Sequence, residues 1–531
     1  MLCTQCVQYC AAARPRKTTA RYASAGITPL GRQRRSPYRD PVLEKRYKSD
    51  VYDPEKRYKV GVQKPEKRYK IVASSSEKRY TVSMLKRTVT QKLLEWKENP
   101  QKKALLIDGA RQIGKTFIIR EFAKEHYTHF VELNFLLQPQ SRLIFEKGGT
   151  AAEIITGITA FSGASLVPGK TLIFLDEIQE CPMARMAVKT LVQDGRFDYI
   201  ESGSLLGIHY KEVPSYPVGY EEELTMYPMG FEEFCSANGV GDETLSYLKD
   251  CFACETPVLD AVHEKMLKLF GYYMIVGGLP AAVQEFVNSH DIGRVVKIQK
   301  DILALYREDI AKYSKNDKPR IKQIFDSIPA ELNKHNLRFM LSDLDKNARG
   351  NRYESSFLWL SDAGVTLPCY NLGAPLIPFR INERRNLFRL FLCDTGLLCA
   401  MCMENVQFEI LKENLEVNMG SIVENCAAQI FAANGFSLHY FDRKNFGELD
   451  FVLQDGSRVL PVELKSGADY KRHPALDHTL AQSEWNIKKG FVFCRGNIAQ
   501  DGGITYFPLY MLMFMKAVSV TGTLIVPGIA F

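Results

Sequence analysis

An apolar run that leads directly into a glycine-rich loop constrains this chain more than any other feature. Residues 104–108 read Ala-Leu-Leu-Ile-Asp, which predicts a short buried strand of a parallel sheet. The run continues into Gly109-Ala-Arg-Gln-Ile-Gly-Lys-Thr116, the GxxxxGK[ST] pattern, and then into a segment of helical character at 117–124. Strand, loop and helix in this order predict an α/β fold of the P-loop NTPase class.

The residue types of this loop suit a triphosphate. Glycines allow the backbone N–H groups and the helix N-terminus to face phosphate oxygens. Lys115 would neutralise β and γ oxygens, and Thr116 would hold Mg²⁺ through its hydroxyl. Arg111 could contact phosphate or equally lie in solvent. We expect the whole loop to contact ATP: Gly109, Ala110, Arg111, Gln112, Ile113, Gly114, Lys115 and Thr116.

A second apolar run, residues 171–175, ends in Asp176 and Glu177. At the carboxyl end of a neighbouring parallel strand, these acids would face the crevice that holds the P-loop. Asp176 is the expected second magnesium ligand, and Glu177 the group that polarises the attacking water. A polar strand exit would explain the pair if it stood alone, but the P-loop upstream favours the catalytic interpretation.

A third predicted strand, residues 197–200, leads into two serines. Ser202 and Ser204 are candidates for sensing the γ-phosphate from the end of that strand. An ordinary Ser-Gly turn explains the same residues equally well.

The first 83 residues differ in character from the rest. They carry 20 Lys and Arg against 7 Asp and Glu, and they repeat Glu-Lys-Arg-Tyr at Glu44, Glu55, Glu66 and Glu77. Repeats this short and polar cannot bury a core. We expect residues 1–83 to be a disordered basic extension or a gene-model artefact, with a transit-peptide-like leader as a further alternative for the first 39 residues.

The remainder of the chain resembles an ordinary globular protein. Outside residues 1–83 it is mildly acidic, so global charge gives no argument for nucleic-acid binding. The thirteen scattered cysteines predict reduced thiols, and the longest late apolar run, 506–515, is shorter than the roughly 20 residues that a membrane span needs. We expect a cytoplasmic protein that does not use a membrane.

Four residues near the C-terminus have the spacing of a PD-(D/E)xK nuclease site. Glu424 lies in a predicted helix, Asp450 in a strand-like segment, and Glu463 and Lys465 two apart in another strand. Three carboxylates beside a lysine would make an oxygen-rich Mg²⁺ site that could activate water against a phosphodiester. The same fold can persist as a binding module, so the spacing leaves cleavage open.

At this point the sequence resembles the prokaryotic, archaeal-ATPase-like AAA-type P-loop ATPases that carry a C-terminal restriction-endonuclease-like domain of unknown function. The motifs that carry the resemblance are Leu106-Ile-Asp-Gly-Ala-Arg-Gln-Ile-Gly-Lys-Thr116, Leu172-Ile-Phe-Leu-Asp-Glu-Ile-Gln-Glu180, Tyr199-Ile-Glu-Ser-Gly-Ser-Leu-Leu-Gly207, Tyr227-Pro-Met-Gly-Phe-Glu-Glu-Phe234, Gly277-Gly-Leu-Pro280 and Leu392-Cys-Asp-Thr-Gly-Leu-Leu398. The resemblance spans nearly all of 84–531 and implies an AAA-type, ASCE nucleotide-binding core with a helical lid and a winged-helix-like segment.

These observations predict five segments. They are the extension at 1–83, the ATP-binding core at 84–235, the helical lid at 236–317, the winged-helix-like segment at 318–400 and the PD-(D/E)xK nuclease-like α/β domain at 401–531.

The predicted function is Mg²⁺-dependent ATP hydrolysis coupled to a nuclease-like domain that acts on DNA. One alternative is a nucleotide-gated switch with little turnover, and another is a Mg²⁺-dependent nuclease in which ATP is secondary. ATP and Mg²⁺ are the expected cofactors. DNA, further copies of the chain or a protein client are the possible macromolecular partners.

Overall fold

The computed structural model describes residues 85–203, 217–313, 318–333, 350–402, 420–444, 446–467 and 469–518. The chain divides into two compact units, Met1–Glu77 and Lys78–Phe531, and all described residues belong to the second. The predicted basic extension at 1–83 and the candidate Ser204 lie outside the described residues.

A five-stranded parallel sheet carries the P-loop. Its order is β2 (His129–Asn134), β3 (Thr171–Asp176), β4 (Asp198–Ser202), β1 (Ala104–Asp108) and β5 (Glu221–Thr225). The P-loop strand β1 is thus separated by β4 from β3, which ends in the predicted acidic pair. Because all these strands are parallel, the carboxyl ends of β1 and β3 lie at the same edge of the sheet.

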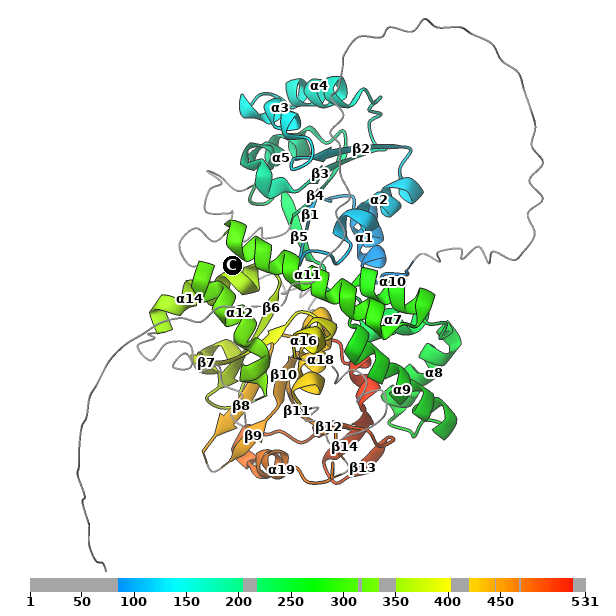
Figure 1. The fold of residues 1–531 in the computed structure, drawn as a ribbon, viewed down its shortest axis with the longest axis vertical. Coiled ribbons are helices and arrows are strands. Elements are labelled where there is room, and N and C mark those ends of the chain that lie inside the picture. The colour runs from blue at the N-terminus through cyan, green and yellow to red at the C-terminus, as the bar shows by residue number, and fades with distance from the viewer. Residues whose placement is uncertain are drawn as a thin grey trace, which may run out of the picture. The chain divides into compact units, whose positions relative to one another are not determined.

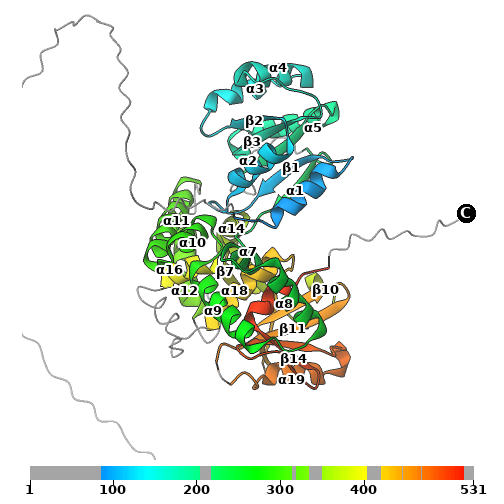
Figure 2. The ribbon, with the colours of Figure 1, turned by 90° about the vertical axis from the view of Figure 1, so that its right-hand side faces the viewer.

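Helices cover both faces of this sheet, as Figures 1 and 2 show. Alternate strand residues explain the two layers, because Leu105 and Ile107 share a core with α1 (Val89–Glu98) and α2 (Lys115–His126). Leu106 faces the other core, which contains α4 (Ala151–Ser162) and α5 (Pro182–Asp194). The short η1 (Pro139–Arg142), α3 (Leu143–Glu146) and η2 (Ile178–Glu180) complete this part.

A run of helices follows the sheet in the region where the sequence predicts a lid. They are α7 (Phe231–Ala237), α8 (Asp242–Cys254), α9 (Asp260–Val276), α10 (Pro280–Ser289) and α11 (Ile292–Tyr313).

Among its described residues, the next segment has two helices followed by a β-hairpin, and the winged-helix-like unit remains a prediction. Its elements are α12 (Lys318–Leu332), α14 (Gly350–Asp362), β6 (Thr366–Leu372), α15 (Phe379–Asn382), β7 (Glu383–Leu392) and α16 (Thr395–Cys402). The β6–β7 hairpin also pairs with β8 (His439–Arg443), which pairs with β9 (Gly447–Leu449), so the sheet order is β7-β6-β8-β9. Strands from both sides of the predicted boundary at 400 therefore share one sheet.

The C-terminal part contains a mixed sheet next to a buried helix. The sheet order is β10 (Phe451–Asp455), β11 (Arg458–Leu464), β12 (Gly490–Cys494), β14 (Ile504–Pro508) and β13 (Ala499–Asp501). The central pairs are parallel and the outer pairs antiparallel. The helices are α18 (Gly420–Ala433), α19 (Pro474–Ala481), η4 (Ser483–Trp485) and η5 (Leu509–Phe514).

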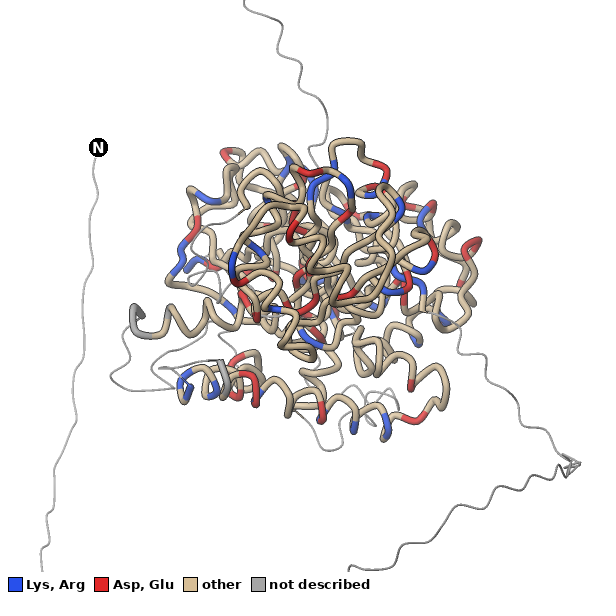
Figure 3. Tube along the Cα trace, turned by 90° about the horizontal axis from the view of Figure 1, so that it is seen from above, with Lys and Arg blue, Asp and Glu red and all other residues tan. Residues whose placement is uncertain are grey.

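Two global features bear on the expected partners. Within the described ranges, no helix combines the length and apolar character that crossing a bilayer demands. Basic and acidic residues are interspersed along the described trace in Figure 3. Any charge-based recognition must therefore come from local groups.

Candidate nucleotide site and C-terminal acidic site

The P-loop backbone depends on glycine at its first position. Gly109 has φ 130°, and a Cβ atom there would lie 2.2 Å from the carbonyl oxygen of Met226. Gly114 has φ 90° and immediately precedes α2, whose first residue is Lys115. The loop therefore delivers a helix N-terminus to the end of β1, as the sequence predicts.

Lys115 is buried inside the loop. Its Nζ donates to the carbonyl oxygens of Gly109 at 2.8 Å and Ala110 at 2.7 Å. Burial lowers the pKa of Lys115 to about 8, although the nearby Glu177, Asp108 and Asp176 act in the opposite direction. The ammonium group contacts carbonyl dipoles rather than a carboxylate, so a bound polyanion would supply the counter-charge.

Asp176 lies at the centre of a group of hydrogen-bond donors. Thr116 Oγ1 lies 3.3 and 3.4 Å from its two carboxylate oxygens, Asn134 Nδ2 donates to Oδ2 at 2.8 Å, and Ser202 Oγ donates to Oδ1 at 2.5 Å. Burial raises the pKa of Asp176, which is 2 % exposed. A divalent cation would stabilise the ionised form that burial disfavours.

Ser202 thus lies where the sequence places it, but it contacts Asp176 in this structure. Asn134, at the end of β2, reaches the same carboxylate and was missed by the sequence analysis. A single Asn at the end of a predicted strand matches no motif, and only the pairing of β2 with β3 places it opposite Asp176.

Glu177 follows Asp176 in a left-handed conformation, with φ 56°. Its backbone N–H donates to Asp176 Oδ1 at 3.1 Å, and Gln179 Nε2 donates to its Oε2 at 2.5 Å. A left-handed non-glycine residue is uncommon and is maintained here between the strand and the 3₁₀ turn η2. Its role in polarising water remains a prediction.

Contacts from other elements fix the loop from outside. Arg87 donates to the carbonyl oxygens of Ile113 at 2.9 Å and Tyr227 at 2.8 Å. Arg111 Nη1 forms an ion pair with Asp309 of α11 at 2.7 Å, and Tyr306 of α11 donates to the Arg111 carbonyl at 2.9 Å. The sequence left open whether Arg111 contacts phosphate or lies in solvent, and here its side chain is paired with Asp309 of α11.

The residues present therefore fit ATP and magnesium. A helix N-terminus and a buried lysine suit the triphosphate, while the Thr116 hydroxyl and the Asp176 carboxylate are hard oxygen donors of the kind that Mg²⁺ takes.

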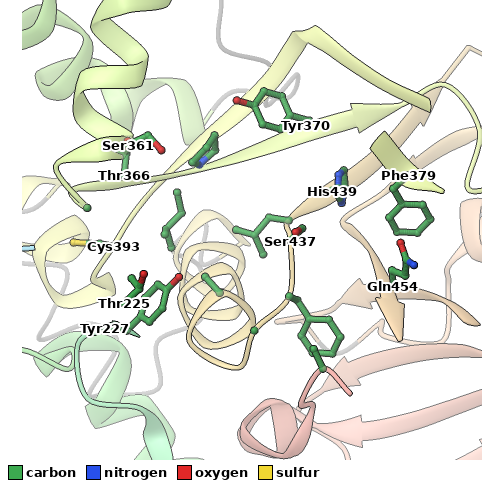
Figure 4. A pocket seen from close by; sticks show the side chains of 18 of the residues that line it. Thr225, Tyr227, Ser361, Thr366, Tyr370, Phe379, Cys393, Ser437, His439 and Gln454 are labelled. Atoms are coloured by element: carbon green, nitrogen blue, oxygen red, sulfur yellow. The ribbon is translucent and has the colours of Figure 1, made fainter. Parts of the chain in front are cut away.

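A separate hollow of about 900 Å³ lies beside the P-loop. Figure 4 shows Thr225 and Tyr227 at one end and Phe379, His439 and Gln454 at the other. Its lining includes Gly109 and Ala110 but not Lys115 or Thr116, so it is distinct from the expected phosphate position.

The predicted C-terminal residues come together on α18, β11 and the turn before β10. Lys465 Nζ lies 3.2 Å from Glu463 Oε2, and Asp450 Oδ2 accepts from the backbone N–H of Leu464 at 2.7 Å. Burial, reinforced by the charge of Asp450, raises the pKa values of Glu424 and Glu463. The residues that the sequence spacing singled out thus lie close together, as a cluster of acids and a lysine.

The sequence predicts that this C-terminal cluster holds Mg²⁺. Within the described part of the chain, no group of three His, Cys, Asp or Glu side chains could hold a metal. Metal binding by Glu424, Asp450 and Glu463 remains a prediction from the sequence.

Comparison with protein families divides the chain into three matched stretches. Residues 101–235 match an AAA domain, residues 267–407 a domain of unknown function (DUF8612) and residues 419–512 another domain of unknown function (DUF4143). No curated protein matches the chain. With the strand order and the P-loop geometry, the first match supports an AAA-type P-loop ATPase domain at residues 101–235.

Among solved structures, the chain is similar to a Walker-type ATPase of Pyrococcus abyssi, with 15% identity over 60% of this chain and 96% of the other and a TM-score of 0.38. The Orc1 protein of Aeropyrum pernix, solved in complex with DNA, shares 13% identity over 59% and 90%, with a TM-score of 0.24. A RuvB variant of Thermotoga maritima shares 16% over 52% and 87%, with a TM-score of 0.26. At TM-scores this low, the likenesses carry no argument about function.

Proposed function

We propose that the protein is a Mg²⁺-dependent ATPase of AAA type whose nucleotide cycle acts on its C-terminal domain. The observation that carries the proposal is the set of donors around Asp176. Thr116, Asn134 and Ser202 all direct donors at this one carboxylate, next to the buried Lys115. Such an arrangement suits a metal-bound triphosphate better than it suits a structural role, because the hydrogen bonds of Lys115 to described residues go to carbonyl oxygens and not to a carboxylate.

Each residue has a proposed role in hydrolysis. Lys115 and the loop N–H groups hold the phosphates, and Thr116 and Asp176 hold the cation, which neutralises developing phosphoryl charge. Glu177 orients the attacking water for in-line displacement. Ser202 and Asn134 position Asp176.

The coupling to the C-terminal part is supported by buried contacts that begin next to the P-loop. A Cβ atom on Gly364, in the turn between α14 and β6, would lie 2.8 Å from Ala110 N. The backbone N–H of Gly278 donates to Asp394 at 2.6 Å, and Thr395 donates to Gln429 of α18 through its backbone N–H at 2.9 Å. Helix α18 also carries Glu424, so these contacts would let a movement of the loop reach the acidic cluster.

The decisive experiment compares steady-state phosphate release by wild type, Glu177→Gln and Glu125→Gln. Glu125 is an exposed residue of α2 and serves as the matched control. We expect Glu177→Gln to lower turnover about a hundredfold or more while it still binds ATP, because a general base is lost. Wild-type protein that binds ATP tightly without releasing phosphate would favour the alternative of a nucleotide-gated switch.

The nature of the client is tested with the same assay. Stimulation by DNA would support the proposed DNA-associated role of a nuclease-like C-terminal domain, and indifference to every nucleic acid would favour a protein client. Mg²⁺-dependent nicking of DNA that disappears in Asp450→Ala and in Lys465→Ala would favour the alternative in which the nuclease is the main activity.

A further inference from the structure

Arg389 of β7 is a buried cation inside the C-terminal acidic cluster. Its side chain is 1 % exposed, and it lies in the segment before α16, far in sequence from the predicted nuclease residues. Arg389 Nη1 lies 3.4 Å from Glu424 Oε2 and 3.4 Å from the carbonyl oxygen of Asp450, and Nη2 forms an ion pair with Glu448. Its guanidinium carbon lies 4.2 Å from the ring centroid of Tyr440.

The other carboxylates of the cluster also face donors. Glu463 faces Lys465, and Asp450 accepts from the backbone N–H of Leu464. The four acids Glu424, Glu448, Asp450 and Glu463 therefore meet two side-chain cations and one backbone donor. A divalent cation in this cluster would compete with these donors for the same carboxylate groups.

We propose that Arg389 occupies the place that a divalent cation would take among these acids, so that Arg389 and a metal ion exclude each other. The arrangement explains why buried carboxylates tolerate one another without a metal: a guanidinium is always charged and presents several donors to oxygens on different elements. Because a guanidinium group keeps its charge in proteins, a movement of β7 relative to α18 would be needed to free the acids.

The test is calorimetric titration of Mn²⁺ into the full chain in a Thr116→Ala, Asp176→Asn background, which removes the expected P-loop metal ligands. We expect this parent to show no Mn²⁺ binding that depends on Asp450. Adding Arg389→Gln should create a site for Mn²⁺. Its affinity should exceed that of any residual binding by the parent at least about tenfold, equivalent to about 1.4 kcal/mol. That site should disappear when Asp450→Asn is added.

Two variants on β7 control for unrelated effects. Arg389→Lys keeps a cation in the cluster and should gain no Mn²⁺ site, and Arg385→Gln alters an exposed arginine of the same strand and should behave like the parent. A folded Arg389→Gln protein that gains no site would overturn the proposal.

A second measurement decides the question even if Arg389→Gln fails to fold. The thermal midpoint of the parent, measured with and without Mn²⁺, is compared with that of the parent carrying Asp450→Asn. We expect Mn²⁺ to change the thermal midpoint of both proteins by the same amount. A Mn²⁺-dependent rise in the parent alone would show that the metal binds while Arg389 is in place, which contradicts mutual exclusion.

Discussion

The nucleotide site and the C-terminal acidic cluster use the same residue types in opposite ways. At the P-loop, the buried cation Lys115 bonds to carbonyl oxygens, and the buried acid Asp176 bonds to neutral side-chain donors. In the C-terminal cluster, Glu424 and Glu463 each face a cation. The first site is left with charges that a metal and a polyanion would satisfy, whereas the second satisfies its charges internally.

The difference shows that residue identity and spacing do not distinguish an available site from a closed one. A buried charge is costly unless it is paired. Where a protein leaves such charges hydrogen-bonded only to neutral groups, a ligand of opposite charge gains affinity by pairing with them. Where it pairs them, the same side chains stabilise the fold and exclude a metal.

The largest expected effect tests the first half of this comparison. Lys115→Ala should lower ATP turnover about a hundredfold or more, because it removes the buried ammonium group that would neutralise the phosphates. Lys124→Ala, on the exposed face of the same helix, is the control and should retain wild-type turnover. Retention of labelled ATP by Lys115→Ala with unchanged affinity would refute the assignment of this site.

The second prediction concerns pH and the buried Asp394, which lies on the proposed route between the two sites. Burial raises the pKa of Asp394 to about 6, against three backbone N–H bonds that lower it. The folded state therefore binds this proton more tightly than the unfolded state, and the associated stability is complete below about pH 4 and lost as the pH rises through 6.

We expect the free energy of unfolding of wild type, relative to Asp394→Asn, to fall by about 2 to 3 kcal/mol between pH 4 and pH 7. Urea unfolding at a series of pH values measures it. Asp250→Asn, which alters an exposed aspartate of α8, should give a difference that does not vary in this way. A flat pH profile for the Asp394 pair would show that this carboxyl titrates as it does in water.

A smaller effect distinguishes positioning from phosphate sensing at Ser202. Ser202→Ala removes one bond to Asp176 and should reduce turnover roughly tenfold, the equivalent of one hydrogen bond to a charged group. If Ser202 acts through Asp176, the variant should require more Mg²⁺ for half-maximal turnover while its affinity for metal-free ATP stays the same. An unchanged Mg²⁺ requirement would favour direct contact with the γ-phosphate.

The sequence predicts the nucleotide site well because its signals are local. Buried parallel strands are continuous apolar runs, and the positive φ of Gly109 and Gly114 admits few residues other than glycine. Asn134 and Arg389 could not be predicted in this way, since each reaches its acid only through pairing or packing of distant segments. The β6–β8 pairing joins strands on both sides of the predicted boundary at 400, and it could not be predicted from the sequence for the same reason.

The smallest expected effect tests whether the closed C-terminal cluster contributes to chemistry at the P-loop. Asp450→Asn keeps an acceptor oxygen for the Leu464 N–H but removes a negative charge from the cluster. Basal ATP turnover without any client should stay within about twofold of wild type, because charges in separate parts of a protein are screened beyond roughly 10 Å of solvent. Steady-state phosphate release measures this, with Asp455→Asn at the end of β10 as the matched control. A large loss in Asp450→Asn alone would mean that the cluster acts on the nucleotide site even at rest, and the two regions would then have to be treated as one catalytic unit.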